Sequence, residues 1–217
     1  LYTVLDYPVI NKMYGRYEAL QPIQAAKKAF ITTRIGDVGL LIGIMLIFKS
    51  TGTFNISSII DLAQNGAVSE SIMTCSSLLI FFGAMGKSAQ FPLHVWLPDA
   101  MEGPTPASAL IHAATMVAAG VYLVARMHPF FDLAPLALPV VFAVGLTTFL
   151  VGGSIALVMT DIKRALAYST MSHLGLMMLS LGAGPWVVAI LHLVVHGLSK
   201  SLLFLCAGNV MHSTGNQ

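Results

Sequence analysis

The chain has 217 residues, of which 56% are hydrophobic and only 9% are charged, and its mean hydropathy is +0.81. Soluble domains carry roughly 25% charged residues, so this composition indicates an integral membrane protein. With a net charge of +2 and no basic cluster interleaved with aromatic residues, nucleic-acid binding has no support. The apolar runs are near twenty residues long and do not alternate, which favours helices over a β-barrel. We therefore predict an all-α, polytopic transmembrane helix bundle.

Six membrane spans follow an N-terminal segment, residues 1–25, that we expect to be a surface or loop region. A polar stretch, residues 49–70, separates the first span from the second. The second span is interrupted, because Pro92 has no amide hydrogen and leaves the carbonyl of Ser88 without its helical donor. A tight turn, residues 101–106, comes next. The expected spans, which together form one transmembrane domain over residues 26–217, cover about 26–48, 71–101, 106–127, 136–159, 165–181 and 186–211.

Basic residues are unevenly shared between the two sides of this bundle. The side with the N-terminus, the turn at 101–106 and the loop at 160–164 holds seven of them, and the opposite side holds two. The positive-inside rule then places the N-terminus on the cytoplasmic, matrix or stromal side. The first group is Lys12, Arg16, Lys27, Lys28, Arg34, Lys163 and Arg164, and the second is Lys49 and Arg126.

Two further lysines, Lys87 and Lys200, fall near the middle of the membrane. A charged amine at this depth costs several kcal/mol, and such residues usually mark an ion or proton path. In the sixth span His192, His196 and Lys200 are spaced i, i+4 and i+8, so they share one helix face at about 6 Å per step. This row predicts a proton relay.

Other interpretations of these residues stay open. Two histidines four apart on a helix are able to bind zinc, although a lysine one turn away opposes a dication and the glutamate of H-E-x-x-H is missing. The histidines of the sixth span could also simply bond neighbouring helices. His112 in the third span either faces the Lys87 helix or is an ordinary interhelix hydrogen-bonding group, and the role of His173 in the fifth span is undecided.

In the first span Arg34 and Asp37 are three residues apart and share a face, as a structural ion pair or as part of a relay. Asp99 and Glu102 are expected in a solvated loop, or at the mouth of a water path. The sequence has no C-x-x-C, no G-x-G-x-x-G and no Walker loop, and no span carries a haem or iron–sulfur ligand set. We therefore expect no cofactor and no metal in this chain, and the energy for transport must come from partners or an ion gradient.

Three segments carry a family resemblance: residues 86–126, with FPLHVWLPDAMEGPTP, residues 161–172, with DIKRALAYSTMS, and residues 196–205, with HGLSKSLLFL. They resemble the largest antiporter-like membrane subunit, often called chain 5, of complex I and of photosynthetic NAD(P)H–quinone oxidoreductases. The same superfamily includes the large subunits of multisubunit sodium/proton antiporters. The resemblance begins near Tyr17 and is strongest to bacterial, cyanobacterial or plastid versions.

The resemblance implies inverted helical repeats with a broken helix in each, of which this chain is expected to be a partial piece. The lysine on the family's broken helix falls on Lys87, and the histidine on the following helix falls on His112. Its acidic residue on the preceding span falls on Asp37. Its connecting lysine and nearby histidines fall on Lys200, His192 and His196.

The chain departs from the family's pattern in three respects. The glutamate that pairs with the broken-helix lysine has no counterpart in residues 1–25, and a second broken helix and a long lateral helix are missing. His173 and Leu176 stand where the family often has Gln and Tyr.

By this resemblance the chain would move protons through a Lys/His relay, coupled to quinone reduction in partner subunits that hold the flavin, the iron–sulfur clusters and the quinone. Its partners would be other antiporter-like subunits and the lipid bilayer, in a bacterial plasma membrane or a thylakoid membrane. The alternatives are a subunit of a sodium/proton antiporter or of an inorganic-carbon uptake complex, a structural membrane-arm component, and a metalloenzyme built on His192 and His196.

Overall fold

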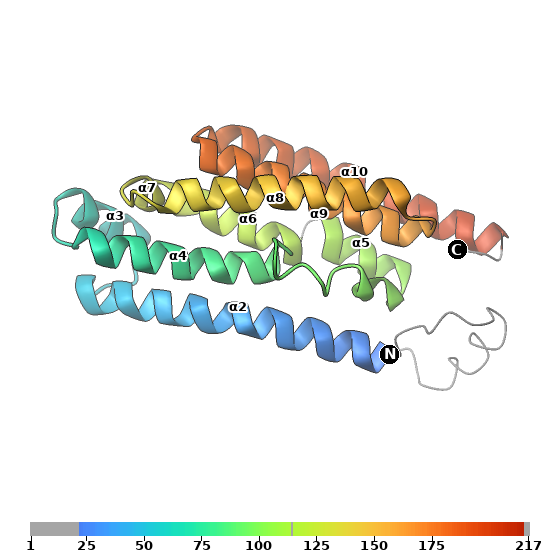
Figure 1. Cartoon of the computed structure of the whole chain (residues 1–217), viewed down its shortest axis with the longest axis horizontal. Helices are drawn as coiled ribbons and strands as arrows, with labels where there is room; N and C mark the ends of the chain where they lie inside the picture. Colours follow the sequence, from blue (N-terminus) through green and yellow to red (C-terminus); the bar gives the residue numbers. More distant parts are fainter. Residues whose placement is uncertain (1–21, 114, 215–217) are drawn as a thin grey trace.

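The computed structural model describes residues 22–113 and 115–214, and the regular elements in these ranges are all helical. The long helices run alongside one another down the long axis of the molecule (Figure 1), which confirms the all-α prediction. In chain order the elements are α2 (Pro22–Thr51), α3 (Ile56–Gln64), α4 (Glu70–Lys87), the 3-10 helix η1 (Asp99–Glu102), α5 (Thr105–Ala113), α6 (Met116–Arg126), α7 (His128–Asp132), α8 (Ala137–Val158), α9 (Ile162–Ala183) and α10 (Trp186–Thr214).

Four of the six predicted spans are long and apolar enough to cross a membrane: α2, the run Thr105–Arg126, α8 and α10. The other two predicted spans correspond to α4 and α9, and their crossing stays a prediction. Helix α9 opens with the charged Lys163 and Arg164, and α4 ends in Lys87. Polar residues at these helix ends shorten the apolar run.

Several predicted boundaries were wrong. The second span does not resume as an α-helix after its break: α4 ends at Lys87, and only η1 follows, at Asp99–Glu102. The third span is divided at Thr115, whose φ and ψ of −106° and −92° are not helical. Residues 22–25, expected in a loop, begin α2. The polar stretch at 49–70 contains α3, because Asn55 caps its first turn by accepting from the Ser57 amide at 3.0 Å.

The predicted basic side of the bundle is one physical end of the molecule. There Lys28 forms an ion pair with Asp99, and Arg164 lies 3.8 Å from Glu102. The start of α2, η1 and the turn before α9 therefore meet, at the right-hand end of Figure 1. Asp99 and Glu102, expected in a loop, are the first and last residues of η1 and are both ion-paired. Lys12 and Arg16 lie outside the described residues.

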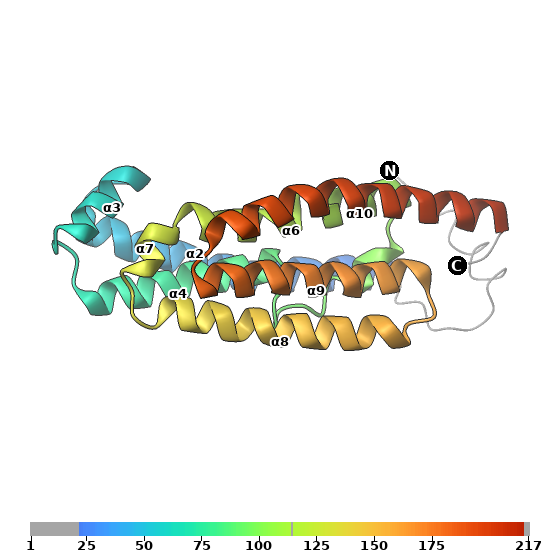
Figure 2. The ribbon, with the colours of Figure 1, turned by 90° about the horizontal axis from the view of Figure 1, so that it is seen from above.

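Glycines allow two helix pairs to pack backbone against backbone, α2 with α4 and α8 with α9; Figure 2 shows the second pair side by side. A Cβ atom on Gly175 of α9 would lie 2.4 Å from the Phe149 amide nitrogen, and one on Gly145 of α8 would lie 2.4 Å from that of Leu179. Gly152 of α8 also packs on α9, because a Cβ atom there would lie 2.8 Å from the Ser172 amide nitrogen. Such contacts drive helix association where lipid replaces water.

Replacing Gly175 by alanine should therefore push α8 and α9 apart. Overpacking of this kind costs about 1–3 kcal/mol, so the full-length protein should unfold at a lower temperature in detergent. Gly103→Ala is the matched control, since its Cβ would have its nearest contact at 3.4 Å, from the Ala100 carbonyl. Equal unfolding midpoints for the two variants would contradict the packing argument.

Candidate functional site

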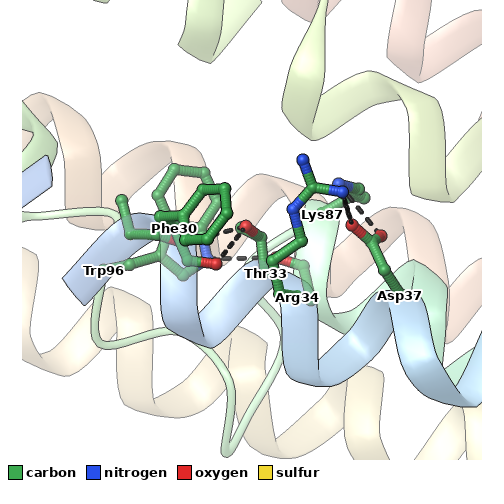
Figure 3. Close-up of polar contacts among 8 residues, drawn as sticks. Phe30, Thr33, Arg34, Asp37, Lys87 and Trp96 are labelled. Carbon is green, nitrogen blue, oxygen red and sulfur yellow. Dashed lines mark hydrogen bonds and ion pairs between the residues drawn. The ribbon is translucent and has the colours of Figure 1, made fainter. Parts of the chain in front are cut away.

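Lys87, at the C-terminal end of α4, forms an ion pair with Asp37 of α2 (Figure 3). Its Nζ lies 3.0 Å from each carboxylate oxygen, and the side chains are 33% and 24% exposed. Arg34 shares the same carboxylate at 3.5 Å, as their common helix face predicted. Two cations therefore face one carboxylate, in a region where an unpaired charge is costly.

The packing of α2 on α4 explains why these two residues meet. Gly36 precedes Asp37, and Gly86 precedes Lys87. A Cβ atom on Gly36 would lie 3.1 Å from the Gly86 Cα, so the two backbones touch at this point. The contact brings the next residue of each helix within reach of the other.

The helix break next to Lys87 leaves carbonyl groups that other side chains satisfy. The Gln90 amide Nε2 donates to the Ser88 carbonyl at 3.1 Å, which is the carbonyl that Pro92 was predicted to free. The Trp96 indole Nε1 donates to the Gly86 carbonyl at 3.0 Å, and Figure 3 shows Trp96 beside this pair of helices. Buried backbone groups need such partners, so these two side chains stabilise the helix break.

Two neighbouring helices hold the break from the other side. The Phe91 amide donates to the Thr148 hydroxyl of α8 at 3.0 Å. The Ser88 hydroxyl donates to the Val117 carbonyl of α6 at 2.6 Å. Gly120 permits this approach, because a Cβ there would lie 2.3 Å from the Ser88 Oγ. Sequence reasoning missed Gln90, Trp96 and Thr148, although Pro92 signalled that carbonyl acceptors near the break would need donors.

A second lysine, Lys200 of α10, is 3% exposed. Its Nζ donates to the Ser169 hydroxyl of α9 at 2.8 Å and lies 3.5 Å from the Leu166 carbonyl. These contacts are neutral, so the Lys200 amine has polar ligands but no counter-ion among them. Ser169 was not singled out from the sequence.

His196 and His192 of α10 lie one and two turns before Lys200, as predicted, and their ring centroids are 6.4 Å apart. His196 is buried, and neither of its ring nitrogens has a hydrogen-bond partner in the described part of the chain. His173 of α9 joins them, with its Nδ1 3.1 Å from the His192 Nε2. The structure therefore gathers three imidazoles next to Lys200.

His112 is fully buried near the end of α5, and its ring centroid is 5.0 Å from that of Phe204 on α10. Helix α5 packs chiefly on α10, the helix that carries Lys200. From the sequence His112 was expected to face the Lys87 helix, whereas in the structure its ring contacts α10. Across residues 22–113 and 115–214, no hydrogen bond or ion pair connects Lys87 to His112 or to Lys200. Within the same ranges, no group of three or more His, Cys, Asp or Glu residues is arranged to hold a metal ion.

Charged residues inside a membrane bundle, at a helix break or beside histidines, are typical of membrane proteins that move ions or protons. Residues 6–217 match the family described as "NADH:quinone oxidoreductase/Mrp antiporter, TM". The chain belongs to this family, and it is a multi-pass membrane protein.

The chain is similar to "NAD(P)H-quinone oxidoreductase subunit 5, chloroplastic" of Nandina domestica, with 53% identity over 87% of this chain and 26% of that protein. The corresponding protein of Nephroselmis olivacea is also 53% identical, over 87% of this chain and 30% of its own length. Among solved structures, the Mrp complex from Dietzia sp. DQ12-45-1b matches with a TM-score of 0.84 and 38% identity, over 89% of this chain and 22% of that one. The chain thus spans about a quarter of the length of these relatives.

The Lys87–Asp37 pair should be energetically coupled. Asp37→Asn leaves the lysine of this part-buried pair without its carboxylate, so the substitution should destabilise the protein. Adding Lys87→Gln to that variant should restore part of the loss. A double-mutant cycle on the unfolding of the full-length protein measures the coupling, expected at about 1–3 kcal/mol.

The ion pair of Arg164 with Asp161, whose side chains are 41% and 30% exposed and whose charged atoms are 3.9 Å apart, is the control for this cycle. Exposed pairs are worth about 0–1 kcal/mol. A coupling between Asp37 and Lys87 no larger than that of the control pair would show that their ion pair is unimportant for the fold.

Proposed function

We propose that the chain is part of the proton-translocating membrane subunit of a complex I-like NAD(P)H– or ferredoxin–quinone oxidoreductase. The observation that carries this proposal is the pairing of Lys87 with Asp37 beside a broken helix end, in a chain 53% identical to subunits 5 of NAD(P)H-quinone oxidoreductases. Quinone reduction takes place in partner subunits, which hold the flavin, the iron–sulfur clusters and the quinone. The chain's own residues hold and pass protons.

In this mechanism Lys87 is loaded and unloaded by movement relative to Asp37. The Asp37 carboxylate, 3.0 Å away, compensates the charge of the Lys87 amine. When the pair separates, the amine loses its counter-ion and gives up its proton. Arg34, at 3.5 Å, is placed to keep the Asp37 carboxylate compensated while Lys87 is apart from it.

Protons leaving Lys87 travel through the buried centre of the bundle by way of His112, towards Lys200. His112 and His196 are buried with ring nitrogens that no protein group in the described chain satisfies. Buried polar atoms are normally hydrogen-bonded, so ordered water supplies these bonds and connects the rings. His192 and His196 then exchange protons with Lys200, which Ser169 holds in place.

The test is made in the intact membrane complex, reconstituted in liposomes. Lys87→Met and Lys200→Met should each abolish or strongly reduce proton uptake per electron, while the redox subunits still pass electrons to quinone. Lys49→Met is the matched control, since Lys49 is an exposed lysine in the last turn of α2. Pumping that persists unchanged in both midplane variants would refute the proposed relay.

A subunit of an Mrp-type antiporter is the second candidate, and the match to the Mrp complex at a TM-score of 0.84 supports it. The higher identity to the quinone oxidoreductase subunits favours the first. Purifying the complex that contains the full-length chain separates the two. Co-purifying iron–sulfur and quinone-site subunits support the oxidoreductase, and sodium-dependent proton flux without quinone supports the antiporter.

A further inference from the structure

Two helix breaks in the bundle each lie beside a titratable side chain of the proposed function. Helix α4 ends at Lys87, and Ser88 is the first residue after it. Helix α5 ends at Ala113, one residue after His112, and α6 begins at Met116. Helices α4 and α6 pack on each other, so the two breaks lie in neighbouring segments.

The break between α5 and α6 has an irregular hydrogen-bond pattern. The Thr115 amide donates to the Leu110 carbonyl, five residues earlier, at 3.3 Å. The Thr115 hydroxyl donates to the same carbonyl at 2.8 Å. An α-helical amide bonds to the carbonyl four residues earlier, so the ladder is shifted by one residue at this point. Irregular turns of this kind are frequent at functional sites, and this one is able to rearrange by exchanging one carbonyl acceptor for the next.

A direct hydrogen bond joins the two breaks. The Ser88 hydroxyl donates to the Val117 carbonyl at 2.6 Å, and both residues are fully buried. Gly120 leaves no side chain between the helices at this level, because a Cβ atom there would lie 2.5 Å from the Ala84 carbonyl oxygen in the last turn of α4. The start of α6 therefore rests on the residue that follows Lys87. Leaving a buried hydroxyl without its partner is unfavourable, so this bond favours joint movement of the two segments.

We propose that Ser88 is a positioning residue that couples the two breaks, so that a displacement of Lys87 changes the backbone beside His112. This inference rests on the proposed function, in which Lys87 moves relative to Asp37, and it adds a conformational connection. When the end of α4 moves, Ser88 carries the Val117 carbonyl with it, and the shifted hydrogen bonds at the α5–α6 break absorb the change. Packed elements with two discrete arrangements transmit small displacements in this way. Ser88 itself carries no proton.

Amide hydrogen exchange, followed by mass spectrometry in the intact complex in liposomes, measures the opening of the backbone at the α5–α6 break. Lys87→Met removes the ion pair with Asp37 and so releases the end of α4. We expect this substitution to raise the exchange rate at the break several-fold. In Ser88→Ala the connection is lost, so adding Lys87→Met to that variant should leave the exchange rate as in Ser88→Ala alone.

Ser77→Ala is the matched control, because Ser77 is a buried serine of the same helix whose hydroxyl has no hydrogen-bond partner in the described part of the chain. In this background Lys87→Met should raise exchange at the break as much as it does in the wild type. A merely structural role of the Ser88 hydroxyl would change exchange in Ser88→Ala without changing the effect of Lys87→Met.

Three outcomes separate this inference from the function on which it depends. Unchanged exchange in Lys87→Met overturns the inference, whatever that variant does to pumping. An equal rise with and without the Ser88 hydroxyl shows that other contacts connect the breaks, and it overturns the role of Ser88. Wild-type pumping in Lys87→Met, with a rise in exchange that requires Ser88, refutes the proposed relay and supports the coupling. Where either variant does not assemble, Lys87→Gln or Gly120→Ala, which disrupt the same contacts, must give the same results.

Discussion

The geometry of the Lys87 site depends on the approach of α2 to α4 at Gly36 and Gly86. Without side chains at these positions, the two backbones touch, and a Cβ on either glycine would lie within 3.3 Å of the other's Cα. That contact places the Asp37 carboxylate 3.0 Å from the Lys87 amine. Since lipid offers no compensation for a bare charge, the pair and the glycine contact depend on each other.

The break at the end of α4 is a second constraint, because its backbone carbonyls need hydrogen-bond donors. A helix that stops inside an apolar bundle exposes carbonyls, and Gln90 and Trp96 satisfy two of them. Thr148 of α8 accepts from the amide at Phe91, so the break is fastened to a second helix. The lysine therefore lies at a helix end whose Gly86 and Ser88 carbonyls both have side-chain donors.

Hydropathy and residue spacing were sufficient to predict the helical class, four of the spans and the row of His192, His196 and Lys200. Each of these follows from a period or an apolar length within one helix. The Lys87–Asp37 pair was not predicted, because it joins two helices whose relative position depends on packing. For the same reason Ser169 and Gln90 were missed, since serine and glutamine in apolar runs have no periodic signature.

Other differences have local causes. The third span was predicted as continuous because the sequence around Thr115 holds neither proline nor glycine, yet its backbone leaves the helical region there. Helix α3 was missed because it has only nine residues, lies in a stretch rich in Ser, Asn and Gly, and depends on the Asn55 cap for its first turn. The sequence does contain a signal for the position of His173. It follows Ser169 by one turn on α9, and this spacing matches that of His192, His196 and Lys200 on α10.

The central claim is that the midplane amines exist because protons pass between them. An experimental map of the intact complex, at a resolution that shows ordered water, tests this most directly. The account predicts a continuous chain of water and polar side chains from Lys87 past His112 to Lys200. Dry apolar packing between the two lysines, or either amine directed to bulk solvent or lipid headgroups, would contradict it.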